Sequence, residues 1–276
     1  MRRYLIVMNA VWVGALVGIV GFGWLLDPYR IFHKPWFRED YYTTDNAMRE
    51  SAAGIINTGD FDGVILGTSM AENFSPAEAS RLFGGRFVNI SMAGSSIVER
   101  AAVLKYALSK KPLSTVIFSA DWEKFRSASV DDSPLAPYLY LYDDNRLNDL
   151  QIYARSLRPL RYAFCRTGAG NRSCRNRKAD LETLVEWHSR PEHRRSFGGL
   201  QKWLEHLDDK QVRAALRQIA DDIRAIRPDA APAQKPAAGK KVATAARLAP
   251  QRKSLDDLLA LVAQYPDTRF ELMPFS

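Results

Sequence analysis

The residues best placed to do chemistry lie in three short turns, at Ser69, Gly94 and Asp121. The run Val64–Asn73 puts Ser69 on a tight turn between a strand and a helix, two residues after Gly67, where a glycine permits close approach of the backbone. A serine hydroxyl is a poor nucleophile unless a base removes its proton, a contribution worth about 10²–10⁴ in rate. Serine chemistry at this turn therefore requires a base. A plain turn without chemistry is the alternative.

Alternating strand and helix signals position these turns. Three short apolar runs, residues 62–66, 86–91 and 114–119, predict buried strands. Capping boxes at Ser75 and Ser96 predict the helices between them. Short helices between apolar strands are typical of parallel strands joined by right-handed crossovers. All three turns then fall at the carboxyl edge of one sheet, where open α/β sheets bind ligands. We therefore expect an α/β fold with one site at this edge.

These motifs, in this order, resemble the SGNH (GDSL-type) hydrolase and acyltransferase superfamily, specifically its membrane-anchored, extracytoplasmic members. The resemblance covers about residues 60–125 and implies a three-layer α/β/α parallel sheet of the SGNH-like, flavodoxin-like kind. In that family a relaxed Gly-x-Ser turn carries the nucleophile, which is Ser69 here. A glycine after the second strand lends an N–H to the oxyanion hole, which implies Gly94 together with the amide of Ser69.

The sequence departs from the family pattern after the third strand. The family usually has Gly-x-Asn-Asp there, with an asparagine that donates to the oxyanion, whereas this chain has Ser119-Ala-Asp-Trp122. An ionised Asp121 cannot donate a hydrogen bond and would repel an oxyanion. We therefore expect Asp121 either to be protonated or to serve another purpose. Asn73, at the end of the first turn, is a further residue of the site edge, to which we assign no role.

The second departure from the family pattern concerns the general base that would activate Ser69. The family takes it from a C-terminal Asp-x-x-His, which does not occur here; the four histidines are His33, His188, His193 and His206. His188 could fold over the site from the segment after the third strand, with a surface or packed histidine as the alternative. Because a predicted strand over residues 268–273 lies close to the last residue, we expect a truncated or frameshifted C-terminus. Loss of catalysis in an intact protein is the competing explanation.

Residues 5–26 form an apolar stretch without a charged residue. As a helix this stretch is roughly 33 Å long, enough to cross a hydrocarbon core of about 30 Å. It lacks the small-residue cleavage site of a signal peptide, so we expect an uncleaved transmembrane anchor, with a buried core helix as the alternative. Arg2 and Arg3 keep the arm of residues 1–4 in the cytoplasm. The remaining chain is then expected on the periplasmic side of a bacterial inner membrane.

Beyond the anchor, we expect a juxtamembrane lead-in over residues 27–58 and one α/β domain over residues 59–276. The lead-in is rich in aromatic residues, which predicts that it places the domain at the membrane interface. Packing of these side chains against the domain is an equally good alternative. Within the domain, residues 126–227 are predicted as a helical insertion. Residues 228–252, rich in Ala, Pro and Lys, predict a low-complexity loop. A last helix is predicted from Ser254.

Two cysteines, Cys165 and Cys174, exclude a disulfide-rich scaffold and a four-cysteine zinc site. In an oxidising compartment they can pair and close a short loop, and we predict this disulfide over the alternative of two unrelated thiols. The sequence contains no cluster of metal ligands and no feature that implies an organic cofactor.

The net charge of the chain and its expected compartment limit which partners it can have. The net charge is +8, and residues 155–178 hold eight basic residues and no acidic one. This segment is either a solvated face or a binding site for an anionic glycan or phospholipid headgroups. Nucleic acid is disfavoured for a domain outside the cytoplasm. We predict a membrane-anchored esterase or O-acyltransferase of cell-envelope glycans, with the lipid bilayer and either an anionic glycan or a membrane-bound acyl-donor protein as partners. The alternative is a catalytically inactive glycan-binding or scaffold protein of the same fold.

Overall fold

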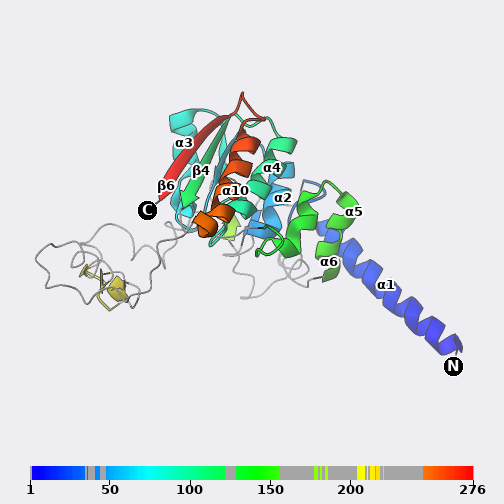
Figure 1. Cartoon of the computed structure of the whole chain (residues 1–276). Coiled ribbons are helices and arrows are strands. Elements are labelled where there is room, and N and C mark those ends of the chain that lie inside the picture. The colour runs from blue at the N-terminus through cyan, green and yellow to red at the C-terminus, as the bar shows by residue number, and fades with distance from the viewer. Residues whose placement is uncertain are drawn as a thin grey trace, which may run out of the picture. The chain divides into compact units, whose positions relative to one another are not determined.

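The computed structural model divides the chain into two compact units, Met1–Val185 with Pro250–Ser276, and Glu186–Ala249. The first unit holds the sheet and the N-terminal helix (Figure 1). The predicted disulfide between Cys165 and Cys174 lies outside the described residues. The structure describes residues 2–34, 36, 41–43, 48–121, 129–155, 177–179, 181, 184–185, 204–208, 210, 212–214, 216–217, 220 and 245–275.

The N-terminal helix α1 (Arg2–Leu26) forms over the predicted apolar stretch, and Gly23 is its only buried residue. Its most apolar window has a mean hydropathy of 2.2. At about 1.5 Å per residue the helix is long enough to cross a hydrocarbon core of about 30 Å. By length and composition, α1 is therefore a candidate membrane anchor or signal sequence.

Four parallel strands form the main sheet, in the spatial order β3-β2-β4-β6. Numbered by their order along the chain, these strands stand second, first, third and fourth across the sheet. All neighbouring strands pair in parallel, which confirms the predicted parallel α/β sheet. β4 continues two residues beyond its predicted end, because all seven of its residues pair with β6. Asp121 is therefore the last residue of a strand and does not follow one. The strands are β2 (Gly63–Leu66), β3 (Phe87–Asn89), β4 (Thr115–Asp121) and β6 (Arg269–Phe275).

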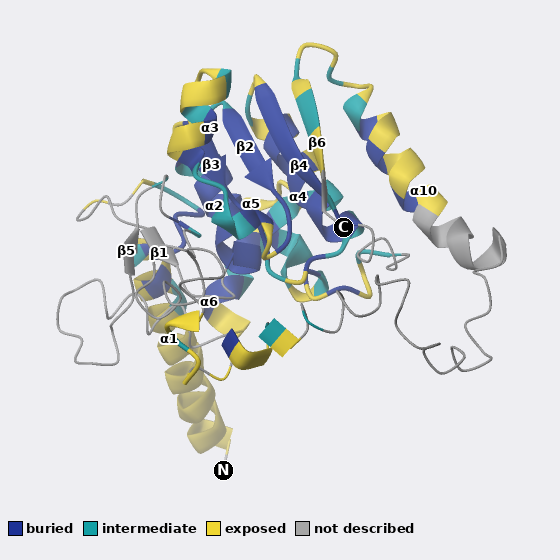
Figure 2. Cartoon of the chain, turned by 90° about the vertical axis from the view of Figure 1, so that its left-hand side faces the viewer, coloured by how far each residue is buried: buried dark blue, intermediate teal, exposed yellow. Residues whose placement is uncertain are grey.

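Helices cover both faces of this sheet (Figures 1 and 2). Helix α3 (Pro76–Phe83) packs on one face, where Ala79 joins a small cluster with Ile65 and Ile117. The other face carries the larger core. Ser75 and Ser96 are the N-caps of α3 and α4, and the predicted capping box is complete at Ser96, whereas at Ser75 only the serine side chain makes its hydrogen bond. The helices that contribute to the larger core are α2 (Met48–Thr58), α4 (Ile97–Lys110) and α10 (Ala245–Val262).

Part of the predicted lead-in belongs to the core of the domain. Nine of the eleven residues of α2 are buried. A Cβ on Gly54 would lie 1.8 Å from the carbonyl oxygen of Tyr29, so α2 and the residues after α1 are in direct contact. Tyr29 is itself buried, whereas Trp36 is 58% exposed. Packing against the domain therefore accounts for Tyr29, and Trp36 remains available to a membrane interface.

Between β4 and α10 the chain forms several short elements. Leu141, Ile152 and Tyr153 of this segment join the larger core. Helix α10 begins inside the segment predicted as a low-complexity loop. The short elements are the 3-10 helix η3 (Ala136–Tyr142), α5 (Arg146–Asp149), α6 (Gln151–Arg155) and β5 (Arg177–Ala179), which pairs antiparallel with β1 (Tyr41–Thr43).

Candidate functional site

The turns after β2 and β3 lie side by side at the carboxyl edge of the sheet. The carbonyl oxygen of Gly67 accepts hydrogen bonds from the Met92 N–H at 2.9 Å and from the Ser95 hydroxyl at 3.2 Å. One oxygen atom thus joins the turn that carries Ser69 to the turn that carries Gly94. This proximity follows from the parallel direction of the two strands.

Gly67 also brings the end of β4 into contact with the first turn. A Cβ at this position would lie 2.4 Å from the Cβ of Ala71 and 2.6 Å from the Cβ of Ser119. Side chains do not approach each other so closely, so the turn packs against β4 only because residue 67 has no side chain. Segments that follow β2 and β3 therefore meet the end of β4 around this glycine.

Ser69 is exposed in the turn that leads into the 3-10 helix η1 (Ala71–Asn73). The carbonyl oxygen of buried Thr68 accepts the Ala71 N–H at 3.0 Å, which closes the turn. Within the described part of the chain, the Ser69 hydroxyl has no hydrogen-bond partner. The hydroxyl is thus accessible to a substrate, but no described base activates it.

The structure describes two of the four histidines. His33 follows α1, where Nε2 of its ring contacts the carbonyl oxygen of Trp24 at 3.0 Å and the ring stacks on Trp36. His206 belongs to the second unit. His33 is not hydrogen-bonded to Ser69. The other two, His188 and His193, lie outside the described residues, so the expectation that His188 covers the site stays a prediction.

Gly94 adopts a φ of +65° in the turn after β3, a left-handed conformation that favours glycine. It is exposed, and a Cβ added there would meet no described atom within 4 Å. The adjacent carbonyl oxygen of Ala93 accepts hydrogen bonds from both Nη atoms of Arg49 at 3.3 Å. Arg49, from α2, therefore holds the backbone of this turn while Gly94 stays open to solvent.

A buried glutamate connects Arg49 to the first turn of α4. Oε2 of Glu99 accepts from Nε of Arg49 at 2.6 Å, and Oε1 accepts from the Ser96 N–H at 3.0 Å. The Ser96 hydroxyl in turn accepts the Glu99 N–H and completes the capping box. Glu99 is only 1% exposed, so water screens this ion pair weakly. The predicted capping box thus also anchors the arginine that holds the Gly94 turn.

Asp121 is an ion-pair partner at the end of β4. Its Oδ2 accepts from the Ser119 hydroxyl at 2.6 Å and from Nη1 of Arg100 at 3.3 Å. Arg100 is fully buried, also donates to the Ser119 carbonyl and lies 5.1 Å from the centroid of the Phe118 ring. Burial lowers the pKa of the Arg100 guanidinium to about 10, against the opposing charges of Asp121 and Glu99. The geometry supports a role for Asp121 other than oxyanion donor.

Asn89, and not Asn73, braces the first turn. Nδ2 of Asn89 donates to the carbonyl oxygens of Ala71 at 2.7 Å and Phe74 at 3.0 Å. Its Oδ1 accepts the Ser91 N–H at 3.0 Å. Asn73 is half-buried in η1, and its Oδ1 has no hydrogen-bond partner among the described residues. The sequence carried no signal for Asn89, because an asparagine that ends a strand is typical of an ordinary turn.

Sequence reasoning also missed Arg49 and Arg100. Arginines in helices are mostly exposed, so neither position indicated a buried charge. The location of Arg100, though not its burial, could have been inferred, because it follows the capping glutamate Glu99 and must lie near the start of α4, at the carboxyl edge. For Arg49 no such inference was possible, since α2 was not predicted as a helix.

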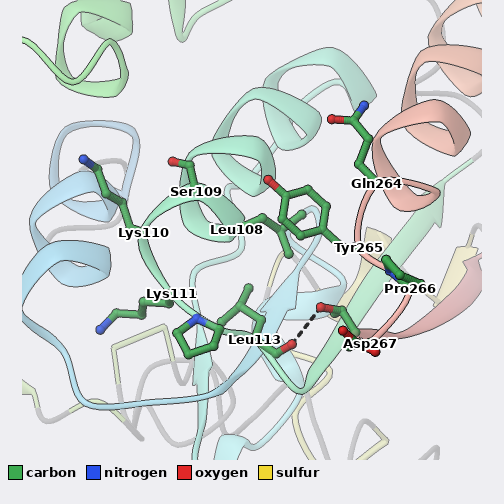
Figure 3. A pocket seen from close by; sticks show the side chains of 11 residues that line it. Leu108, Ser109, Lys110, Lys111, Leu113, Gln264, Tyr265, Pro266 and Asp267 are labelled. Carbon is green, nitrogen blue, oxygen red and sulfur yellow. Dashed lines mark hydrogen bonds between the residues drawn. The ribbon is translucent and has the colours of Figure 1, made fainter.

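A cavity of about 440 Å³ lies at the opposite edge of the sheet, between the end of α4 and the loop before β6 (Figure 3). The two lysines that line it already have partners. Nζ of Lys111 donates to the Gly59 carbonyl at 2.6 Å, and Lys110 pairs with Asp144. Because α4 ends and β4 begins at this edge, the cavity is separated from Ser69 by the length of the sheet. It is not part of the candidate site.

In the part of the chain that the structure describes, no group of three or more His, Cys, Asp or Glu side chains could hold a metal ion. Comparison with protein-family models, with curated proteins and with solved structures found no match for this chain. Its function must therefore be inferred from the residues at the carboxyl edge.

Proposed function

We propose that this chain is a membrane-anchored, SGNH-like serine esterase or O-acyltransferase that acts on cell-envelope glycans. The observation that carries the proposal is the Gly67 carbonyl, which holds the Ser69 turn against the Gly94 turn. The strand order supports it, because flavodoxin-like sheets with the order second, first, third, fourth bind their ligands at this edge. The glycan substrate is inferred only from the family resemblance of these motifs.

In the proposed reaction, the hydroxyl oxygen of Ser69 attacks the carbonyl carbon of the acyl donor while a base takes the hydroxyl proton. The carbonyl oxygen becomes an oxyanion, which the N–H groups of Ser69 and Gly94 would stabilise. Collapse of this intermediate expels the donor alcohol, which takes up the proton, and leaves an ester on Ser69. Water or a glycan hydroxyl then releases the acyl group by the reverse steps. Among the described residues of the unit that carries the sheet, none is hydrogen-bonded to Ser69 as a base.

The buried arginines would hold this machinery in place without touching the substrate. Arg49 fixes the carbonyl next to Gly94, and therefore the peptide plane that presents the Gly94 N–H. Arg100 neutralises Asp121, so that the carboxylate at the end of β4 does not repel a nearby oxyanion. In the proposed enzyme both are positioning residues.

The proposed location is the periplasmic face of a bacterial inner membrane, with α1 as a single-pass anchor. A reporter domain fused after residue 40 tests this orientation. We expect activity of a periplasm-dependent reporter, because Arg2 and Arg3 favour the cytoplasm for the N-terminus. Activity of only a cytoplasm-dependent reporter would contradict it.

A fluorophosphonate probe tests the proposed chemistry on the full-length protein in detergent. The wild type should be labelled covalently, and Ser69→Ala should not. Ser109→Ala is a matched control, because Ser109 lines the cavity at the opposite edge and should not affect labelling. If labelling persisted in Ser69→Ala but disappeared in Ser109→Ala, the reactive serine would be Ser109 in that cavity, and the proposal for Ser69 would be wrong.

Failure to label either the wild type or Ser69→Ala would instead favour the second candidate function, a catalytically inactive envelope protein that binds a glycan. One observation supports this candidate: the Ser69 hydroxyl has no base among the described residues. A binding protein should retain an acidic cell-wall polysaccharide equally well as wild type and as Ser69→Ala. An enzyme should label with the probe, whatever its affinity for the polysaccharide.

A further inference from the structure

The end of α1 is joined to α6 by direct contacts. A Cβ on Gly23 would lie 2.5 Å from the ring of Tyr153, so the ring packs against a helix position without a side chain. The Tyr153 hydroxyl donates to Oδ1 of Asp27 at 2.7 Å. Helix α6 therefore packs beside the last turns of α1 (Figure 1).

Asp27 fixes the direction in which the chain leaves α1. Its φ of +33° ends the helix, and its buried carboxylate accepts backbone N–H groups of Ile31, Phe32 and His33 at 2.7–3.0 Å. With the Tyr153 hydroxyl, at least four donors among the described residues contact this carboxylate. The junction is therefore a defined structure and not a free linker.

This junction leaves an apolar groove on the outside of α1. Leu150 joins α5 to α6 and forms one wall, and Leu147 of α5, nearby, is 78% exposed. Leu147 is more exposed than any large apolar residue of α1. The groove has a volume of about 580 Å³ and is lined by Leu16, Val17, Val20, Gly21, Trp24 and Leu150.

The position of the groove along α1 sets its depth in a membrane. About 20 helical residues cross a hydrocarbon core, which corresponds to Leu5–Trp24 if the arginines at positions 2 and 3 stay at the cytoplasmic surface. Trp24 then lies at the outer interface, where tryptophan is enriched. Leu16 lies eight residues earlier, about 12 Å deeper. A groove lined from Leu16 to Trp24 therefore opens within the outer leaflet.

We propose that the segment Arg146–Arg155, comprising α5 and α6, is a second membrane-contacting element of this protein. Leu147 and Leu150 enter the outer leaflet beside α1, and a lipid acyl chain fills the groove. The argument is continuity: the groove extends the apolar surface of α1 without interruption, and acyl chains are what surrounds that surface if α1 spans the membrane. The inference thus rests on the proposed anchor.

The contact would also orient the candidate site. Tyr29, two residues after Asp27, donates to Oε2 of Glu50 at 2.6 Å. The adjacent residue of α2, Arg49, holds the Ala93 carbonyl beside Gly94. The carboxyl edge of the sheet is thus connected to the end of α1, and α1 leaves the domain on the side where the strands end (Figure 2). With α5 and α6 in the leaflet, this edge faces the membrane, so a substrate carried by a lipid would reach it.

Depth-dependent quenching tests the proposal on the full-length protein. Single cysteines at positions 147, 82 and 13, in a background with Cys165→Ser and Cys174→Ser, carry the fluorophore NBD. Leu82 is the matched control, an exposed leucine at the end of α3, at the opposite edge of the sheet. Val13, in α1, is the positive control for the anchor. The protein is reconstituted in vesicles of phosphatidylethanolamine and phosphatidylglycerol, with or without phosphatidylcholine spin-labelled near the headgroup end of its acyl chain for positions 147 and 82, or near the methyl end of its acyl chain for position 13, which lies close to the middle of the bilayer.

We expect the spin label to reduce NBD emission at least about twofold at position 147 and to leave position 82 unchanged, because only the first lies in the leaflet. Emission at position 147 as unquenched as at position 82, with position 13 quenched, would overturn the inference but keep the anchor. A blue-shifted but unquenched signal at position 147 would also overturn it, since protein and not lipid would then cover the groove. An unquenched position 13 would remove the anchor and the inference together.

Discussion

The carboxyl edge of the sheet and the junction of α1 with α6 both bury carboxylates, but they neutralise them in different ways. At the edge, Glu99 and Asp121 are paired with Arg49 and Arg100. At the junction, the donors to Asp27 that lie among the described residues include three backbone N–H groups and a tyrosine hydroxyl, all of them neutral. A buried carboxylate that is stabilised mainly by one arginine loses most of that stabilisation when the arginine is replaced. A carboxylate that accepts several hydrogen bonds from neutral donors loses only a fraction of its stabilisation when one donor is removed.

The comparison predicts that the largest effect comes from Arg100. Arg100→Met keeps much of the apolar stem but leaves Asp121 buried without its cation, and breaking a buried pair on one side costs about 3–5 kcal/mol. We expect a loss of this size in the free energy of unfolding, measured by urea titration of the full-length protein in detergent.

Arg81→Met is the matched control for this loss. Arg81 is also paired with a carboxylate, that of Glu78, but the pair is exposed on α3, where solvent screens it, so its loss should barely change the free energy of unfolding. Equal losses in Arg100→Met and Arg81→Met would show that burial of the edge pair has no energetic consequence.

At the junction, we expect that removing a single hydrogen-bond donor lowers the free energy of unfolding by a smaller amount. Tyr153→Phe removes one of at least four donors to the Asp27 carboxylate and keeps the ring against Gly23, so it should cost about 1 kcal/mol. Asp27→Ala removes the acceptor of all of them and should cost about 2–3 kcal/mol. Urea unfolding measures both. If Tyr153→Phe cost as much as Asp27→Ala, the hydroxyl alone would hold the carboxylate, and the proposed sharing among donors would be wrong.

The two regions also differ in how far the sequence predicted them. The strands and the turns at Gly67 and Gly94 could be predicted because their signals are local: apolar runs, glycines and serine caps within a few residues. Parallel strand direction then brings the turns to one edge without further information. The partners of Asp121 could not be predicted, because burial of Arg100 depends on how α4 packs against β4 and no single helix encodes it.

The junction was not predicted at all, for a related reason. Its elements α5 and α6 are four and five residues long, too short for a helical period to stand out. The docking position on α1 is Gly23, which in the sequence is one of several glycines in an apolar helix. Only the ring of Tyr153, distant in the sequence, distinguishes it. Contacts between distant segments of this kind leave no local pattern.

The smallest expected effect concerns Asp149, which lies between Leu147 and Leu150. Burial, and next the charge of Asp143, raise the pKa of Asp149 to about 6; Arg146 and Lys110 oppose this shift and Asp144 adds to it. The ordinary value is 3.8. Between these values the folded protein binds a proton that the unfolded chain does not, so stability should fall as the pH rises from about 4 to about 6 and then level off.

Asp149→Asn removes this titration. Below pH 4 the variant and the wild type should be equally stable, because the carboxyl is neutral in both the folded and the unfolded wild type. Above pH 6 the variant should be more stable by about 1 kcal/mol, once screening by solvent is counted. Urea unfolding across this pH range measures the difference, and Asp256→Asn, on the exposed side of α10, should show none. A stability gain that is constant with pH would mean that Asp149 is ionised at no cost. The segment beside α1 would then carry a stable charge, which would set it apart from the outer leaflet that we propose it enters.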